Sequence, residues 1–220
     1  MGSITRSFAN NIGSSGILTA SAVTNATVED ITSFDNAASN ATLVLLSTQT
    51  ASASANISFT TGLDSTYDEY QFHFINIRPA TDSVQFEFNM STDGGSNYNV
   101  TKTTTAFKAH HNEADTDTTL SYSTARDLAQ STSFQMLGEQ VGNGADEQCS
   151  GTLTLFNPSS TIYVKHFISN FNSYNDANYS INFYVAGYGN TTSAINAIRF
   201  QFSSGNIDDG IIKLYGVKKS

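Results

Sequence analysis

The chain has 220 residues, of which 39% are hydrophobic and only 13% are charged, and its net charge is −9 at pH 7. This balance argues against nucleic acid as a ligand, because contact with phosphates needs clustered cations, and against adsorption to an anionic membrane surface. Cys149 is the only cysteine, which excludes an intrachain disulfide and a cysteine-rich zinc site. We therefore interpret it as a buried thiol.

The N-terminal segment differs from the rest of the chain. Its first fifty residues are small and polar with scattered aliphatic residues, and Phe8 and Phe34 are their only aromatic residues. Such a segment buries too little apolar surface to offset the entropy lost when it becomes ordered. We therefore predict an extended N-terminal segment over residues 1–41, held by a partner, and a single folded domain over residues 42–220.

Two further features of the sequence indicate where in or outside the cell the protein is located. The longest aliphatic run, Leu43 to Leu46, is far shorter than the ~20 residues of a membrane-spanning helix. The start of the chain also lacks the charged-then-apolar layout of a signal peptide. Neither membrane insertion nor export by the standard route is expected.

Strict alternation of apolar and polar residues runs through much of residues 58–217. Residues 70–74 (YQFHF) and 84–90 (VQFEFNM) each place apolar side chains on one face, as half-buried antiparallel strands do. Pro79 ends the first of these strands, and turn signals separate the later ones. Further strands are expected over residues 42–48, 53–60, 104–109, 151–156, 161–169, 179–186, 197–202 and 211–217. The sequence therefore predicts an all-β fold, a single jelly-roll-like antiparallel β-sandwich of about eight to ten strands.

Segments without alternation are expected to be loops or short helical turns. Residues 112–122 and 138–148 are polar and predict long loops. One or two helical turns are expected over residues 124–130, with Ser123 or Thr124 as the N-cap.

The segment from His110 to Asp117 (HHNEADTD) is dense in metal-ligating residue types. Its two adjacent histidines should point to opposite faces of a strand end, so they would not bind one ion together. Its acidic residues lack the central glycine and closing glutamate of a calcium loop. We interpret it as a solvated acidic loop and assign no metal and no cofactor. Asp208, Asp209 and Gly210 are a weaker candidate and predict a hairpin turn.

No motif supports enzyme activity, and we assign no catalytic residues. The sequence has no Gly-x-Ser-x-Gly elbow, and no particular pair of carboxylates indicates glycoside hydrolysis. His73 falls on the polar face of its strand. His166 is expected on the apolar side of residues 161–169, in phase with Ile162 and Ile168, as a hydrogen-bonded core or subunit-interface histidine. A small hydrolase that uses the His110–Asp117 segment is the weakest alternative.

Carbohydrate binding is a stronger alternative, because many β-sandwiches stack sugars on exposed aromatic side chains. Tryptophan is absent, so the candidates are tyrosines expected in loops, namely Tyr98, Tyr122, Tyr174 and Tyr188. The competing interpretation, which we favour, is that these tyrosines cover the ends of the sandwich or contact other chains.

Three segments carry a resemblance to a known group of proteins. They are residues 46–99 (from LSTQTASASANISF to GGSNYN), 155–169 (LFNPSSTIYVKHFIS) and 185–218 (from VAGYGNTTSAINAIRF to KLYGVK). In these segments the chain resembles virion-surface structural proteins of marine tailed phages, notably cyanophages. The opening SITRSFANNI is similar to attachment segments of phage appendage proteins.

The resemblance implies a non-enzymatic virion structural protein, located on the surface of the phage particle and assembled in the host cytoplasm. As a tail-fibre or host-adhesion appendage, it would be anchored to other capsid or tail proteins through residues 1–41 and would present the sandwich as a head to a host surface glycan or protein. The family also implies a homotrimer. The alternatives are a capsid decoration (cement) protein and a carbohydrate-binding module.

Overall fold

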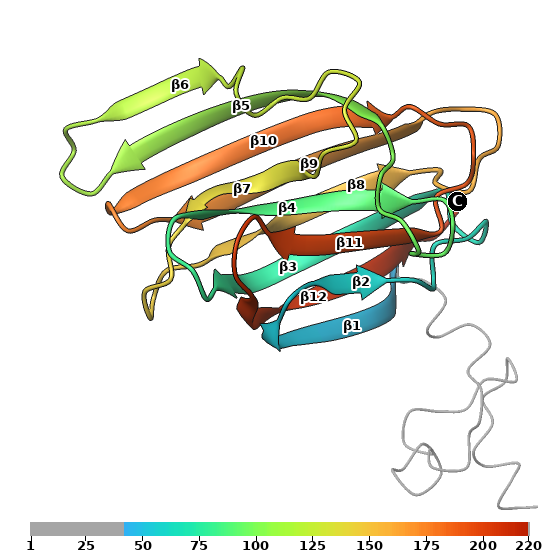
Figure 1. The fold of residues 1–220 in the computed structure, drawn as a ribbon, viewed down its shortest axis with the longest axis horizontal. Helices are drawn as coiled ribbons and strands as arrows, with labels where there is room; N and C mark the ends of the chain where they lie inside the picture. The colour runs from blue at the N-terminus through green and yellow to red at the C-terminus, as the bar shows by residue number, and fades with distance from the viewer. Residues whose placement is uncertain (1–41, 220) are drawn as a thin grey trace, which may run out of the picture. The chain divides into compact units, whose positions relative to one another are not determined.

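The computed structural model describes residues 42–219, which form two antiparallel β-sheets and no helix (Figure 1). The larger sheet has eight strands in the spatial order β1 (Leu43–Ser54), β12 (Ile207–Val217), β3 (Glu69–Pro79), β8 (Cys149–Phe156), β9 (Lys165–Tyr174), β10 (Tyr179–Gly189), β5 (Lys102–Asn112) and β6 (Thr118–Tyr122). The smaller sheet has four, in the order β2 (Ile57–Phe59), β11 (Ala197–Phe202), β4 (Val84–Ser91) and β7 (Gln135–Val141).

This architecture confirms the predicted all-β antiparallel sandwich, which is open at its sides. Successive strands cross repeatedly between the two sheets, as they do in a jelly roll. The domain has twelve strands, more than the alternation alone predicts. The extended segment predicted over residues 1–41 lies outside the described residues.

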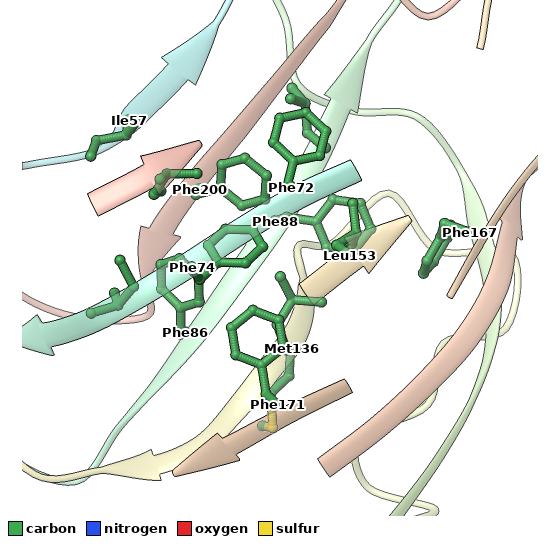
Figure 2. Packing of buried hydrophobic residues seen from close by; sticks show 14 of the residues in the cluster. Ile57, Phe72, Phe74, Phe86, Phe88, Met136, Leu153, Phe167, Phe171 and Phe200 are labelled. Carbon is green, nitrogen blue, oxygen red and sulfur yellow. The ribbon is translucent and has the colours of Figure 1, made fainter. Parts of the chain in front are cut away.

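The core lies between the two sheets and consists largely of phenylalanine side chains. Figure 2 shows Phe74 of β3, Phe86 of β4 and Phe200 of β11 gathered there. The ring centroids of Phe74 and Phe200 are 4.9 Å apart with the planes at 75°, and those of Phe74 and Phe86 are 5.6 Å apart at 74°. Each such edge-on pair adds about 0.5–1.5 kcal/mol beyond area burial. The apolar face predicted for β3 and β4 is therefore the one that is buried.

Two strands occupy segments whose polar composition predicts loops. β6 lies within residues 112–122, and β7 overlaps residues 138–148. β6 has no buried side chain, so no apolar alternation marks it. β7 is almost wholly buried, including Gln135 and Glu139. Because these two polar groups are hydrogen-bonded inside the domain, β7 lacks alternation as well.

Residues 124–130 form a turn and an extended segment in place of the predicted helical turns. The N–H of Arg126 donates to the carbonyl of Ser123 at 3.0 Å, which closes one turn. The chain then runs beside β5, where the N–H of Thr104 donates to the carbonyl of Leu128 at 2.8 Å. Pairing with β5 thus takes the place of further helix.

Asp208, Asp209 and Gly210 lie within β12 instead of forming a hairpin turn. The pairing of β12 with β3 shifts register on both sides of Asp209, and Gly210 has a φ of 128°, which residues with a side chain rarely adopt. The carboxylate of Asp208 accepts a hydrogen bond from Arg78 at 2.5 Å. An irregularity inside the strand therefore accommodates these turn-forming residues.

The larger sheet extends beyond the smaller sheet that covers it. β7, the last strand of the smaller sheet, packs against β9 and β10, so β5 and β6 project past it (Figure 1). Polar contacts join β7 to β5 along this side. Lys108 Nζ donates to Glu139 Oε2 at 2.8 Å, and Thr104 Oγ1 donates to Gln135 Oε1 at 2.6 Å.

Candidate functional site

Three aromatic side chains form a row on the outer face of the eight-stranded sheet. Tyr122 of β6, Phe107 of β5 and Tyr184 of β10 lie opposite one another in adjacent strands. The rings of Phe107 and Tyr184 are stacked, with centroids 5.0 Å apart and planes at 23°. Phe107 is 40% exposed and Tyr122 is 51% exposed. The row therefore offers solvent an aromatic surface.

Amide and hydroxyl side chains continue this row across β10 and β9. Asn170 is the register neighbour of Tyr184, and its Oδ1 accepts a hydrogen bond from Asn182 Nδ2 at 2.6 Å. Asn172 Nδ2 donates to Ser180 Oγ at 2.9 Å on the same face. The outward positions of β5, β9 and β10 include no Asp, Glu, Lys or Arg. We use the name outer platform for the neutral set Tyr122, Phe107, Tyr184, Asn170 and Asn182.

A shallow hollow of about 430 Å³ adjoins the outer platform. His166 and Ile168 of β9, Tyr188 of β10 and Phe156 of β8 contribute to its lining. The ring of His166 lies edge-on to that of Tyr188, with centroids 6.0 Å apart. No carboxylate lines the hollow, so it suits an apolar group better than a cation.

The exposed position of His166 corrects the phase predicted for its strand. On β9 the inward residues include Lys165 and Phe167, whereas His166 and Ile168 point outward. β9 begins at Lys165, and Ile162 belongs to the preceding loop, where it is 71% exposed. A lysine takes the first buried position because two backbone carbonyls accept hydrogen bonds from its ammonium group. His166 is therefore not a core histidine.

The four tyrosines considered for sugar stacking have different environments. Tyr122 is exposed but belongs to β6, while Tyr174 and Tyr188 are half-buried near the ends of β9 and β10. Tyr98 is the one in a loop, and the guanidinium group of Arg199 lies 4.0 Å from its ring centroid. Of these four tyrosines, only Tyr122 therefore belongs to the outer platform, and Tyr188 lines the hollow beside it.

Phe107 and Tyr184 are the residues that the sequence prediction missed. The sequence does contain a signal for Tyr184, because it shares the polar face of its strand with Asn182 and Ser180. An aromatic residue on the polar face of a strand is exposed when that face is in solvent. Phe107 gave no comparable signal, since the residues around it, from Thr103 to Ala109, are mostly threonine and alanine.

The segment His110–Asp117 forms the turn between β5 and β6 together with the adjoining strand ends. Its histidines point to opposite faces, as predicted, with side chains 17% exposed for His110 and 56% for His111. His110 Nε2 lies 3.5 Å from Asp117 Oδ2, and His111 Nε2 lies 3.0 Å from Asp115 Oδ1. Since the potential ligands separate in this way, no group of three or more His, Cys, Asp or Glu within residues 42–219 is placed to hold a metal ion.

A cleft of about 230 Å³ lies on the inner side of this turn, and its ionisable lining residues are Lys108, His110, Asp117, Asp176 and Tyr179. Tyr179 Oη donates to Asp117 Oδ2 at 2.9 Å, and this hydrogen bond raises the pKa of Tyr179. No serine, threonine or cysteine lines the cleft. The acid–base groups that line this cleft therefore have no serine, threonine or cysteine nucleophile among them.

Cys149, the only thiol of the chain, lies in the core, as predicted. It is fully buried among the hydrophobic residues that fill the space between the two sheets. Burial raises the pKa of this thiol, which keeps it protonated and unreactive.

No family model, curated protein or solved structure matches this chain. Within the part of the chain that the structure describes, no helix is long and apolar enough to cross a membrane. The fold and the surface together define an open antiparallel β-sandwich domain whose larger sheet presents a neutral, partly aromatic surface over β5, β10 and β9.

Proposed function

We propose that this chain is a non-enzymatic structural protein on the surface of a tailed-phage particle. In this proposal residues 1–41 attach it to other capsid or tail proteins, and the sandwich is displayed as a head that adheres to the host. The outer platform carries the proposal, because it is an exposed, neutral surface of rings and amides on an otherwise well-packed domain. The resemblance of the sequence to surface proteins of marine tailed phages supports the same role.

The chemistry of the outer platform fits a neutral surface glycan. Aromatic rings stack on the apolar faces of sugars, and the amides of Asn170 and Asn182 supply hydrogen-bond donors and acceptors beside them. The absence of cationic side chains from this part of the face disfavours phosphate-rich ligands. The net charge of −9 of the whole chain also disfavours phosphate-rich ligands.

Incorporation into particles tests the attachment role. A chain that lacks residues 1–41 keeps the whole hydrophobic core of the sandwich, so it should fold, which circular dichroism checks. Particles assembled with the truncated chain should lack the protein, whereas particles assembled with the full chain should contain it. Truncated protein that still joins the particle contradicts the anchoring assignment.

Capsid decoration is the alternative within the same particle, since an exposed sheet face also serves to clamp neighbouring subunits. The copy number per particle distinguishes the two roles. A number that matches the shell lattice indicates decoration, and a number that matches the tail symmetry indicates an appendage.

A carbohydrate-binding module is a second alternative, which the same aromatic row favours. Strong and selective binding on a glycan array, combined with absence of the chain from purified particles, would indicate this function instead.

A further inference from the structure

The edge of β6 lacks the features that protect the other sheet edges from pairing. The four edge strands within residues 42–219 are β1, β6, β2 and β7. β1 shifts register between Leu45 and Ser47, β7 shifts register against β4 and has a positive φ at Gln140, and β2 is only three residues long. β6 pairs with β5 over five residues without a shift and contains neither proline nor a charged residue. A regular, unprotected edge of this kind accepts another strand.

The hydrogen bonds of the neighbouring chain show which backbone groups of β6 face this edge. Ser123, directly after β6, donates its N–H to the carbonyl of Ala106 at 2.8 Å, so its backbone faces β5. In an antiparallel ladder, alternate residues direct their N–H and C=O groups to opposite sides. Thr118, Leu120 and Tyr122 therefore direct their backbone groups away from β5, toward the free edge.

The side chains of the same residues are unusually exposed. Leu120 is 75% exposed, the highest value among the exposed large hydrophobic residues of the described chain, and Tyr122 is 51% exposed. Both lie on the outer face of the sheet, opposite Ala109 and Phe107 of β5. An incoming strand would cover these apolar side chains as well as the backbone.

We propose that β6 is the contact through which two copies of this chain join, edge to edge, in a two-fold antiparallel pair. Centred on Leu120, this register places Leu120 opposite the partner's Leu120, and Thr118 opposite the partner's Tyr122. In this ladder the Leu120–Leu120 pair and the two Thr118–Tyr122 pairs each exchange two backbone hydrogen bonds, whereas the Thr119–Ser121 pairs between them do not, because their backbone groups face β5. The larger sheet then continues from one copy into the next.

The charge pattern of β6 favours a second copy as the occupant, because pairing in this register sets no like charges opposite each other. β6 itself is neutral. In this register Asp117, directly before β6, meets the partner's Ser123 and not another carboxylate. Asp127, whose Oδ2 accepts a hydrogen bond from Tyr122 Oη at 2.7 Å, accompanies a tyrosine that meets the partner's Thr118. Self-pairing of a chain with net charge −9 therefore brings no like charges together along the ladder. Isologous two-fold contacts are also the commonest way in which identical subunits join.

Pairing through β6 affects both the outer platform and the symmetry of the assembly. Tyr122 lies at the β6 end of the aromatic row, so pairing through β6 brings the platforms of two copies onto one continuous sheet face. The pair is two-fold, in contrast to the homotrimer that the family resemblance implies. This inference goes beyond the proposed function and does not depend on it.

Cross-linking of the full-length protein tests the register. In Leu120→Cys, the two new cysteines occupy a hydrogen-bonded antiparallel pair, whose Cα atoms are ~5.5 Å apart, within disulfide range. Cys149 is buried and gives no background reaction. We expect a covalent dimer of Leu120→Cys under mild oxidation. The matched control Ile162→Cys, at a loop residue that is 71% exposed, should remain a single chain.

Analytical ultracentrifugation tests the contact without a cross-link. The wild-type chain should sediment at twice the mass of one chain. Leu120→Lys, which sets two like charges opposite each other at the two-fold axis, should halve that mass, whereas Ile162→Lys should leave it unchanged. Circular dichroism reports whether the variants fold, and if Leu120→Lys does not, the cross-linking result decides.

Three results would overturn the proposal. They are a wild-type chain that is monomeric at every concentration, an oligomer (a trimer included) whose mass Leu120→Lys leaves intact, and equal cross-linking of the two cysteine variants.

Discussion

Lys102 Nζ lies 2.6 Å from Asn89 Oδ1, in a fully buried hydrogen bond between β5 and β4. The same nitrogen donates to the carbonyl of Val100 at 2.8 Å. No acidic group among the described residues forms an ion pair with Lys102. Burial lowers the pKa of Lys102 to about 7, and a neutral amine has one N–H for each of these two acceptors. The chain therefore buries a lysine that is partly uncharged at neutral pH.

The free energy of unfolding should rise as the pH increases from about 7 toward 10. The pKa of Lys102 is about 7 in the folded state, against 10.5 for an unperturbed lysine. Between these values the unfolded state binds more protons, so raising the pH favours the folded state. The gain is on the order of a few kcal/mol, and urea denaturation at several pH values measures it.

Lys102→Met is the matched variant for this pH prediction. This variant should reduce the increase of the free energy of unfolding with pH. Any increase that remains belongs to groups such as Lys165, because burial lowers the pKa of Lys165 as well. A wild-type stability that stays level or falls between pH 7 and 9 contradicts the assignment.

Removing Asn89 should cost more stability than removing Lys102. Asn89→Ala leaves the buried amine of Lys102 without one of its two acceptors, a loss of about 1–3 kcal/mol. Lys102→Met retains most of the side-chain volume and no longer has an amine to bury. Urea denaturation at neutral pH compares the two variants, and a larger loss for Lys102→Met would contradict this reasoning.

Truncation of the outer platform should weaken adhesion without unfolding the domain. Phe107→Ala and Tyr184→Ala each remove one ring of the stacked pair, which should weaken binding roughly tenfold. Binding of the purified chain to host cells or to an immobilised glycan measures the effect. Tyr163→Ala is the control, because Tyr163 is 67% exposed in a loop outside the platform. Equal losses for all three variants would argue against a platform-specific interaction.

Glu139 should stabilise the polar side of the sandwich where β7 meets β5. Its side chain is 5% exposed and bonds both Lys108 and Arg126. Glu139→Ala removes both charged hydrogen bonds and should lower the free energy of unfolding by about 2 kcal/mol. Arg126→Ala should cost less, since Arg126 is 35% exposed and Glu139 keeps its contact with Lys108. Thermal and urea unfolding of the two variants test this order.

The fold class could be predicted because residues 69–74 of β3, 84–88 of β4 and 198–202 of β11 alternate between buried and half-buried residues. The prediction was wrong where polar residues take buried positions. Lys165 begins the inward face of β9, so the phase that placed His166 in the core was inverted. Part of β7 was predicted as a loop for the same reason. Its buried residues Glu139 and Gln135 are polar and hydrogen-bonded inside the domain, and a polar segment without alternation is typical of a loop.

The outer platform could not be predicted because it depends on register between distant strands. The rings of Phe107 and Tyr184 stack because the pairing of β5 with β10 sets these two residues opposite each other. Alternation reveals which face a residue occupies but not which strand lies beside it. The orientation of the two histidines in the segment from His110 to Asp117 could be predicted, because adjacent residues of one strand point to opposite faces, and the structure places them in separate histidine–aspartate pairs.

Electron cryo-microscopy of purified phage particles tests the central claim of a displayed, particle-bound sandwich most directly. The account predicts density that fits the two-sheet domain at the particle surface, with the outer face of the eight-stranded sheet accessible from solution. Particles that lack this density, and lack the chain when their proteins are analysed by mass spectrometry, would contradict it.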